Sequence, residues 1–422
     1  MDSAAFPPKM MARNKEPKRP DMWERIFERL VRSIVVDGTL RITLPSGRRF
    51  AAGSGAPEVA ATIHDEATVR RILANPDLAT AEGYMDGRLT LENDDLRGFL
   101  GMVLTNMRKG NRHWSQDAQI AIGRHLRRFS QFNPMDRARK NVAHHYDLSS
   151  DLYDLFLDED RQYSCAYFRS DNDTLEQAQL QKKRHIARKL QLEPGMRVLD
   201  IGCGWGGMAL TLAEEFGVEV LGVTLSTEQH AMATKRARER DLSDRVAFRL
   251  QDYRAIPETF DRIVSVGMFE HVGQPHYDEY FGKVRDMLTP DGVALVHTIG
   301  RSNPPGITSP FIAKYIFPGG YLPALSEMSA AIERQALVST DIEVWRLHYA
   351  KTLNHWERRF AAGWETAKAL YDARFCRMWK YYLVVSEMSF VHGAQVVFQA
   401  QLARRNDAVP ITRDYMYPDG LA

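Results

Sequence analysis

The stretch Arg197-Val-Leu-Asp-Ile-Gly-Cys-Gly-Trp-Gly-Gly207 decides the fold of this chain. It predicts a buried β-strand that ends at Asp200, a glycine-rich turn, and a helix that begins at about Met208. Glycine in such a turn lets the backbone pass close to a ligand where a Cβ atom would clash. Strand–turn–helix units of this kind occur in dinucleotide, phosphate and S-adenosylmethionine (SAM) sites, so the residues that follow must distinguish them.

Apolar segments of strand length alternate with helical segments around this stretch. The expected strands are residues 197–201, 219–224, 246–251, 261–267 and 292–298, and the expected helices lie near 206–216, 227–240 and 276–288. This alternation predicts an α/β fold with a Rossmann-like, doubly wound sheet. The final quarter differs, because residues 353–392 predict a long helical tract rich in Trp, Tyr and Phe, followed by an apolar strand at 395–401.

The N-terminal part predicts a smaller, mostly helical domain. Residues 1–20 are rich in Pro and Lys and are expected to be disordered. A helix is expected to begin after Asp21 with Arg25, Arg29 and Arg32 off its apolar stripe, so it either packs in a core or contacts lipid. Residues 39–44 and 49–52 should form a hairpin, and further helices should follow to about residue 130. We therefore expect a disordered tail (1–20), an N-terminal lipid- or membrane-docking domain (21–130), a linker at 131–134, and a catalytic region within residues 131–422.

The composition excludes several classes of protein. With 56 Lys and Arg against 54 Asp and Glu, the formal net charge is only +2, which is unlike a nucleic-acid-binding protein. No run of about 18 apolar residues exists, so no membrane-spanning helix is expected. The cysteines Cys165, Cys203 and Cys376 form no Cys-x-x-Cys pair, which fits a reducing cytoplasm and argues against a metal site built from cysteine. We expect neither a nucleic acid nor a metal as a ligand.

Positive charge is concentrated between residues 97 and 140, where ten Lys or Arg stand against Asp117 and Asp136. Such a segment favours an anionic surface, and because no aromatic ladder is interleaved, a membrane fits better than a nucleic acid. A solvated charged face is the alternative, and the sequence leaves both open.

Polar residues at the tips of the second and third predicted strands distinguish the ligand classes. A dinucleotide site usually has an acidic residue after the second strand, but Thr224 and Ser226 stand here. The glycine turn also lacks the Gly-Lys-Ser/Thr ending of a phosphate-binding loop. After the third strand, Asp252 offers a carboxylate for an adenine amino group, with the Tyr253 ring beside it. This order favours an adenosyl ligand, and we predict SAM as the cofactor.

Longer motifs add a family resemblance. The segments that carry it are Val198–Gly207, His145–Asp147, Gln162–Tyr167, Gly222–Ser226, Gln251–Arg254, Phe260–Gly273, Leu295–Gly300, Ile316–Gly320 and His348–Leu353. Over roughly residues 135–392 the chain resembles the cyclopropane-fatty-acyl-phospholipid synthases and the related mycolic acid cyclopropane synthases. The resemblance implies a class I SAM-dependent methyltransferase fold. It also implies transfer of a methylene group from SAM to the cis double bond of an unsaturated phospholipid acyl chain.

Such a reaction makes particular demands on the protein. An alkene is a weak, neutral nucleophile, so the sulfonium must supply the drive and the protein must hold methyl and alkene in line. Positive charge then moves onto the acyl chain, where aromatic faces can stabilise it without trapping it. Tyr163, Tyr167, Phe269 and the aromatics of 353–392 are candidates, with ordinary core packing as the alternative for the last group.

Ring closure requires a base that removes a proton from the newly added methyl group. The resemblance implies a bound bicarbonate ion at this point, surrounded by Cys165, Glu270, His297, Tyr349 and the backbone carbonyl of Ile299. Bicarbonate has both acceptor oxygens and a hydroxyl donor, so it can bridge such groups. Glu270 and His297 could tune its proton affinity. Taken singly, His297 would be a core histidine and Cys165 an inert thiol; their combination indicates catalysis.

One candidate catalytic position departs from the family's pattern. Family members often carry a cysteine in the segment that matches 381–386, and here Ser386 stands at that position, followed by Glu387. Either the cysteine is dispensable, or this chain performs a related reaction that gives a methyl-branched or unsaturated acyl product. Glu387 in a lipid-lined helix would be costly unless it is paired or exposed.

The remaining expectations concern the cofactor contacts and the membrane. We expect residues 301–323 to form a mobile cover over the acyl entrance. The enzyme should be cytoplasmic and bind peripherally to the inner face of the membrane, where it would reach unsaturated acyl chains of the phospholipid bilayer, and the family tendency is compatible with a homodimer. The predicted SAM contacts are Tyr163, Ser164, Asp200, Gly202, Gly204, Gly206, Thr224, Leu225, Gln229, Gln251, Asp252 and Tyr253.

Overall fold

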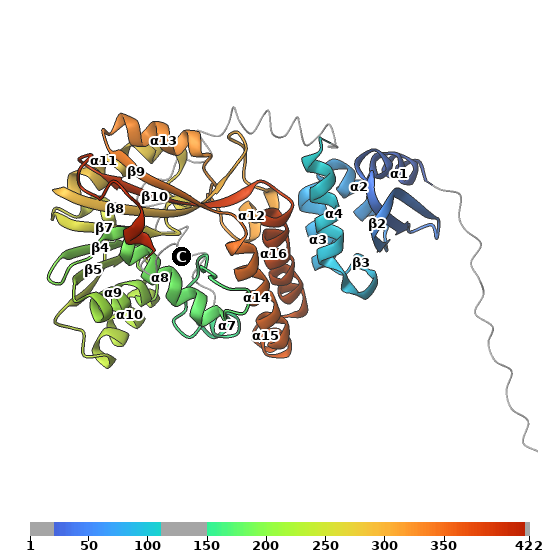
Figure 1. Cartoon of the computed structure of the whole chain (residues 1–422). Coiled ribbons are helices and arrows are strands. Elements are labelled where there is room, and N and C mark those ends of the chain that lie inside the picture. The colour runs from blue at the N-terminus through green and yellow to red at the C-terminus, as the bar shows by residue number, and fades with distance from the viewer. Residues whose placement is uncertain (1–20, 111–149, 418–422) are drawn as a thin grey trace, which may run out of the picture.

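A seven-stranded sheet forms the centre of the larger part of the molecule (Figure 1). The computed structural model describes residues 21–110 and 150–417. The strand order is β6-β5-β4-β7-β8-β10-β9; β4 to β8 run parallel, and β10 is antiparallel to β8 and β9. The strands are β4 (Arg197–Ile201), β5 (Glu219–Thr224), β6 (Val246–Leu250), β7 (Phe260–Val266), β8 (Leu288–Arg301), β9 (Val338–Trp345) and β10 (Gln395–Ala403).

The predicted doubly wound sheet is confirmed, and each predicted strand is present within a few residues except that β8 begins earlier and ends later than expected. The strand β9 was not predicted. Its burial pattern is irregular, and exposed Val344 and half-buried Glu343 lie beside each other, so it lacks a clean alternation of apolar and polar residues. Strand order reverses between β4 and its neighbours β5 and β7, which opens a crevice at the carboxyl ends of these strands.

Helices cover both faces of this sheet. One face packs against α8 (Leu175–Leu190), α9 (Gly207–Phe216) and α10 (Thr227–Glu239), and the other against α11 (Tyr277–Met287) and α13 (Leu325–Arg334). The helix α8 lies upstream of the region where alternation was first recognised, so it was missed. Its start carries a capping box, in which Thr174 Oγ1 accepts from the Gln177 amide and Gln177 Oε1 accepts from the Thr174 amide.

The predicted aromatic tract, which lies between β9 and β10, is three helices rather than one. These are α14 (His348–Ala362), α15 (Trp364–Leu370) and α16 (Ala373–Val391). The first break falls at Gly363, and the second at Asp372, whose carboxylate caps α16 by accepting from the Phe375 amide at 2.6 Å. Many aromatic side chains of these helices are buried in one core with α7 (Ser150–Asp154) and the short α12 (Pro310–Tyr315).

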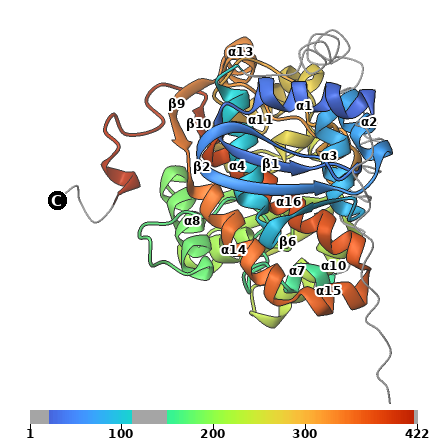
Figure 2. The ribbon, with the colours of Figure 1, turned by 90° about the vertical axis from the view of Figure 1, so that its right-hand side faces the viewer.

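The N-terminal unit is mostly helical, as expected, and also contains a small sheet (Figure 2). The expected hairpin exists, but its second strand is much longer than residues 49–52, because the chain beyond them pairs with the first strand a second time: Thr39 pairs with both Gly53 and Glu58. Expected helices beyond residue 110 and the linker at 131–134 lie outside the described residues. The elements are α1 (Met22–Ile34), β1 (Asp37–Thr43), β2 (Arg49–Ile63), α2 (Glu66–Ala74), α3 (Pro76–Met85), β3 (Leu89–Leu91) and α4 (Leu96–Arg108), with a three-stranded sheet in the order β1-β2-β3.

Helices α3 and α4 of this unit pack against α16, so the N-terminal unit shares a core with the aromatic helices. Arg97 of α4 donates to Glu357 at 2.7 Å and to Glu387 at 2.9 Å, and Asn354 donates to the other oxygen of Glu387 at 2.8 Å. The concern that Glu387 lies unpaired in an apolar helix is therefore resolved. Within the basic segment 97–140, Arg97 is thus engaged in this core, and Lys109 forms an exposed ion pair with Asp37 at 2.6 Å. Residues 111–140 lie outside the described ranges.

Candidate active site

The first of two adjoining cavities lies at the carboxyl ends of β4 to β7. All but one of the predicted cofactor residues line it: Tyr163, Ser164, Asp200, Gly202, Gly204, Thr224, Leu225, Gln229, Gln251, Asp252 and Tyr253. Residues that the sequence reasoning did not select also contribute, among them Gly267, Met268 and His271, which follow β7. Their position after a parallel strand, at the same sheet edge as the glycine turn, is the signal that could have identified them.

Gly206 is the predicted cofactor residue that does not line this cavity. It caps α9 with φ +85°, and a Cβ atom built on it would lie 2.8 Å from the Phe248 ring and 2.9 Å from Ala233 Cβ. Gly206 therefore serves the close packing of the turn, whereas Gly204 (φ +54°) has open space where its Cβ would be.

Two polar side chains that were expected to contact the cofactor already form hydrogen bonds within the protein. Asp252 accepts from the Arg254 amide and guanidinium at 2.7–2.9 Å, so its carboxylate is already held by a cation. Thr224 Oγ1 donates to Gln229 Oε1 at 2.9 Å, which fixes both side chains at the tip of β5. Asp252 can still accept a further hydrogen bond, because a carboxylate has about four acceptor positions.

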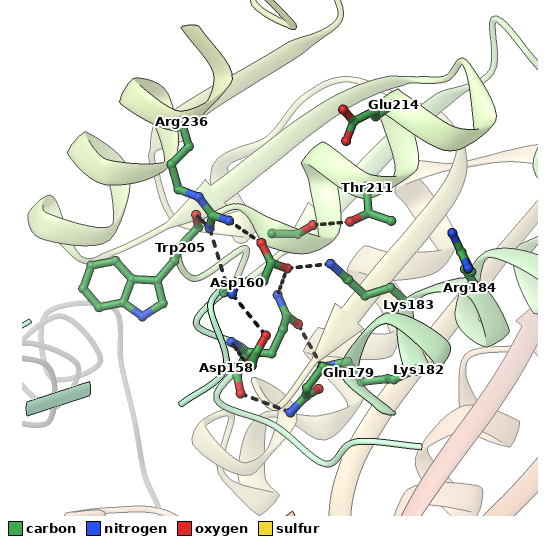
Figure 3. A network of polar contacts seen from close by, with 12 residues as sticks. Asp158, Asp160, Gln179, Lys182, Lys183, Arg184, Trp205, Thr211, Glu214 and Arg236 are labelled. Carbon is green, nitrogen blue, oxygen red and sulfur yellow. Dashed lines mark hydrogen bonds and ion pairs between the residues drawn. The ribbon is translucent and has the colours of Figure 1, made fainter. Parts of the chain in front are cut away.

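A network around Asp160 attaches the loop that precedes α8 to the glycine turn (Figure 3). The Asp160 carboxylate accepts from Lys183 at 2.6 Å, from Gln162 Nε2 at 3.0 Å and from Arg236, and Arg236 also donates to the Trp205 carbonyl at 2.8 Å. This arrangement holds Tyr163, Ser164 and Cys165 next to the cofactor turn. The lysine and arginine lower the pKa of Asp160, although its burial acts in the opposite direction.

The second cavity brings together every predicted catalytic residue. Cys165, Glu270, His297, Ile299, Tyr349 and Ser386 all line it, although they come from a loop, the short turn η3 (Phe269–His271), β8, α14 and α16. Most of its wall is apolar or aromatic: Phe311, Ile312, Phe317, Leu353, Tyr381, Tyr382, Val385 and Phe390. Part of the segment 301–323, including α12, forms one side of this wall. The N-terminal unit also reaches it, because Asp77 lines the cavity and accepts from Ser309 at 2.9 Å.

Glu270 is buried in this wall with half of its carboxylate engaged. Its Oε1 accepts from the Ile299 amide at 2.7 Å, while Oε2 is buried and makes no hydrogen bond within the described part of the chain. Burial raises the pKa of Glu270 to about 7, although the Ile299 amide and the nearby Thr298 hydroxyl oppose this rise. A buried carboxylate oxygen without a donor is uncommon and suits a site that receives a polar ligand.

His297 and Cys165 are both held in their neutral forms. Burial lowers the pKa of His297 well below its usual value, and the positive charge of Lys182 acts in the same direction. His297 Nδ1 lies 3.0 Å from Gln399 Nε2, and the Trp345 ring stands edge-on at 5.1 Å. Burial also raises the pKa of the Cys165 thiol, which makes a thiolate nucleophile unfavourable there.

The two cavities share part of their walls. Tyr163, Ser164, Gly267 and His271 line both, so a group held in the first cavity can be passed to the second at this boundary. Tyr163 is fixed there by stacking on Trp356, with ring centroids 5.2 Å apart, and by a hydroxyl contact of 2.8 Å with Tyr382. The candidate Tyr167 lies elsewhere, stacked between His185 and His348, and Phe269 packs in the sheet core; neither lines the second cavity.

Comparison with known proteins identifies the family. Residues 134–400 match the family described as Mycolic acid cyclopropane synthetase. The chain belongs to this family. It is 43% identical over 317 residues to the cyclopropane-fatty-acyl-phospholipid synthase of Escherichia coli (strain K12), a match that covers 74% of this chain and 80% of that protein.

Solved structures agree with this assignment. A cyclopropane synthase from Mycobacterium tuberculosis matches with a TM-score of 0.61 and 34% identity, covering 64% of this chain and 99% of its own. A mycolic acid cyclopropane synthase in complex with SAH and CTAB matches with a TM-score of 0.60 and the same identity and coverage. The chain is therefore a SAM-dependent methyltransferase with the class I fold.

The first cavity of this methyltransferase fits SAM on features of its own. Asp200 Oδ2 is buried at the end of β4 and has no hydrogen-bond donor among the described residues, so an ammonium group would satisfy it. Burial raises the pKa of Asp200 to about 7, and Lys182 opposes this rise. Across residues 21–110 and 150–417 no group of three or more His, Cys, Asp or Glu has the arrangement of a metal site. No helix within those ranges is long and apolar enough to cross a bilayer.

Proposed function

We propose that this methyltransferase adds a methylene group from SAM to the cis double bond of a phospholipid acyl chain and forms a cyclopropane ring. One observation carries the proposal: the residues expected around a bicarbonate ion all meet in one apolar-walled cavity, which adjoins the cofactor cavity. An acyl chain requires such a wall, and a proton-accepting ion requires polar groups within it. The relative from Escherichia coli is named for this activity on phospholipids.

The chain's own residues would divide the chemistry between the two cavities. When bound, SAM supplies an electrophilic methyl group on a positively charged sulfur. Tyr163 and Ser164 stand at the boundary where that methyl would cross, and Tyr163 also offers an aromatic face. Tyr382 and Phe317 in the acyl wall offer further rings, with centroids 6.0 Å apart. These faces can stabilise the positive charge that develops on the acyl chain, because the ring quadrupole attracts a cation without forming a bond.

We call the second cavity the acyl cavity and the first the cofactor cavity. The polar end of the acyl cavity would hold bicarbonate as the base that accepts the proton released on ring closure. A neutral His297 can donate to the ion, Glu270 Oε2 can accept from the ion's hydroxyl group, and both are shielded from water. Placing the base next to an apolar wall keeps it poorly solvated, and a poorly solvated base has a higher proton affinity.

The related reaction, which stops after methyl transfer, remains the alternative because Ser386 lines the acyl cavity where family members often carry cysteine. Trideuteromethyl-labelled SAM and vesicles of a cis-monounsaturated phospholipid distinguish the two reactions by mass spectrometry. The proposal expects a gain of one methylene unit, loss of one deuteron and loss of the alkene. Retained unsaturation, or a methyl branch, would contradict ring formation. Removal of bicarbonate from the buffer should lower the rate, and an unchanged rate would contradict the assignment of the base.

We further propose that the enzyme is cytoplasmic and binds the inner face of the membrane through α1. Met22, Trp23 and Ile26 are 60%, 37% and 42% exposed on this helix. Arg25 and Arg29 are exposed on the same helix, so an anionic bilayer matches both the apolar and the charged side chains. The dimer expectation is not needed for this proposal.

A further inference from the structure

Lys182 is a fully buried lysine of α8 that lies behind the boundary of the two cavities. It is 0% exposed, and its Nζ donates to Gln162 Oε1 and to Ser164 Oγ, both at 2.8 Å. Among the residues that the structure describes, no carboxylate lies within ion-pair distance of this ammonium group. The buried lysines on the same helix differ, because Lys183 pairs with Asp160 and Lys189 pairs with Glu343. A buried cation without a counter-charge is costly, so its retention requires a reason.

The two hydrogen bonds determine where Ser164 directs its own proton. An ammonium group has only donors, so Ser164 Oγ must act as the acceptor toward Lys182 and its hydroxyl proton is left to donate elsewhere. Ser164 lines both cavities, and its hydroxyl is therefore a donor offered to a ligand. Gln162 is ordered in the same way, because its Oε1 accepts from Lys182 and its Nε2 donates to Asp160 at 3.0 Å. A hydroxyl donor with a cation behind it is suited to bind an anion.

The surroundings of Lys182 leave its charge without a dedicated partner. Asp160 is already held by Lys183 and Arg236, and Asp158 accepts from the Gln162 amide at 2.9 Å, with a pKa that burial raises to about 6. Burial lowers the pKa of Lys182 itself to about 7, although the negative charge of Asp158 opposes this fall, so its protonation at neutral pH depends on whether a further anion is near. The ionisable groups that interact with it are Asp158, Asp160, Cys165, Lys183, Asp200 and His297.

We propose that Lys182 is a positioning residue that holds Ser164 as the receptor for the carboxylate of SAM, and that this carboxylate supplies the counter-charge that Lys182 lacks. The inference rests on SAM binding in the first cavity and places the amino-acid end of SAM at Ser164, which lines that cavity, and it is independent of what happens to the acyl chain. Because Ser164 faces both cavities, bicarbonate is a second possible source of the same anionic oxygen chemistry, and the test separates the two.

The test compares two ligands that differ only in the carboxylate. Binding of SAM and of decarboxylated SAM to the full-length protein is measured by calorimetry without lipid, in buffer freed of bicarbonate. The wild-type protein should prefer SAM by about tenfold or more, which is the strength of a hydrogen bond to a charged group. Lys182→Met should abolish most of this preference and leave the affinity for decarboxylated SAM within about twofold. A preference that survives in Lys182→Met, or an equal loss for both ligands, would overturn the proposal.

The pH dependence gives a readout that a purely structural role would not change. As the pH rises through about 7, Lys182 loses its proton and the wild-type preference for SAM should fall. Asp200 titrates in the same range, and the α-ammonium group of SAM loses its proton near pH 8, below the ammonium group of decarboxylated SAM. Both effects are present in the wild type and in Lys182→Met, so the pH dependence due to Lys182 is the difference between the two proteins in the ratio of affinities. In Lys182→Met the ratio should be small and should lack the fall near pH 7 that Lys182 causes in the wild type. If added bicarbonate alone creates the Lys182-dependent effect, the anion is bicarbonate and the assignment to SAM is wrong.

Three further variants test whether Lys182 acts through Ser164 rather than through a general loss of structure. Ser164→Ala alone should reduce the preference for SAM to the level of Lys182→Met. The double variant should show no further loss, because each single change already removes the interaction that Lys182 and Ser164 make together with the carboxylate. Additive losses would show that Lys182 does not act through Ser164. Lys189→Met is the matched control, since it removes another fully buried lysine from the same helix and should keep the wild-type ratio. If Lys182→Met fails to fold, Ser164→Ala still tests the receptor.

Discussion

The cofactor cavity and the acyl cavity share a wall but are built in different ways. The cofactor cavity is assembled largely from the ends of consecutive parallel strands, where short local motifs place glycines and polar side chains at one sheet edge. The acyl cavity takes its polar end from a loop, a short turn, a strand and two helices that lie far apart in the sequence. The first is a product of local sequence and sheet topology; the second depends on how the helical layer packs on the sheet.

This difference predicts that removing one carboxylate from each cavity affects different kinetic constants. The loss of kcat in the acyl-cavity variant is the largest effect that we expect. Glu270→Gln should lower kcat by about a thousandfold, because the carboxylate that would hold the bicarbonate base next to the reacting centre is lost, while SAM affinity stays within a few fold. Asp252→Asn, its counterpart in the cofactor cavity, should instead raise KM for SAM with little effect on kcat. Steady-state kinetics with vesicles and calorimetric SAM binding measure both. Wild-type turnover in Glu270→Gln would remove Glu270 from the mechanism.

The buried Glu270 carboxyl group should also make the free energy of unfolding depend on pH. Burial raises the pKa of Glu270 to about 7, so the folded state binds a proton more tightly than the unfolded chain. Stability therefore falls as pH rises between about 4.5 and about 7, by up to about 3 kcal/mol from this group. Glu270→Gln cannot ionise, so its stability relative to wild type should increase over this range. Urea unfolding of the ligand-free protein at several pH values measures the difference, and a constant difference would contradict the raised pKa.

The sequence predicted the cofactor cavity well because its residues follow from local pattern. The ends of three predicted strands are marked by the glycine turn after Asp200 and by the polar residues Thr224 and Asp252. Parallel strands bring such ends together at one edge of the sheet. The acyl cavity was predicted only through family resemblance: nothing in the spacing of Cys165, His297 and Tyr349 shows that a loop, a strand and a helix meet. Strand β9 was missed because its apolar and polar positions do not alternate clearly, and helix α8 was missed because it lies upstream of the region where the alternation of strands and helices was recognised. Lys182 was missed because its hydrogen-bond partners lie in a preceding loop.

In the glycine turn beside the cofactor cavity, Gly206 shows where local pattern misleads. Gly202, Gly204 and Gly206 were expected to admit a ligand, but Gly206 packs against Phe248 and Ala233. Gly206→Ala should therefore destabilise the fold by about 2 kcal/mol, through a positive φ and a Cβ clash, whether or not SAM is present. A Cβ atom at position 204 would meet open space, so Gly204→Ala should reduce SAM affinity more than it reduces the free energy of unfolding. Thermal unfolding with and without SAM separates the two, and equal profiles would contradict the distinction.

The smallest expected effect concerns how each cavity is reached, since SAM arrives from water and the acyl chain from a bilayer. Replacing Trp23 with Ser, and Arg25 and Arg29 with Glu, removes the exposed apolar and basic side chains of α1. Each basic residue near an anionic surface is worth about 1 kcal/mol, so binding to anionic vesicles should fall at least tenfold and KM for vesicle lipid should rise. SAM affinity and activity on lipid dispersed in detergent micelles should stay unchanged, because neither cavity includes α1. Arg41→Glu on exposed β1 of the same unit is the control for a nonspecific charge effect. If that control weakens vesicle binding as much as the α1 variant, the helix has no special role and access to the acyl cavity depends on overall charge alone.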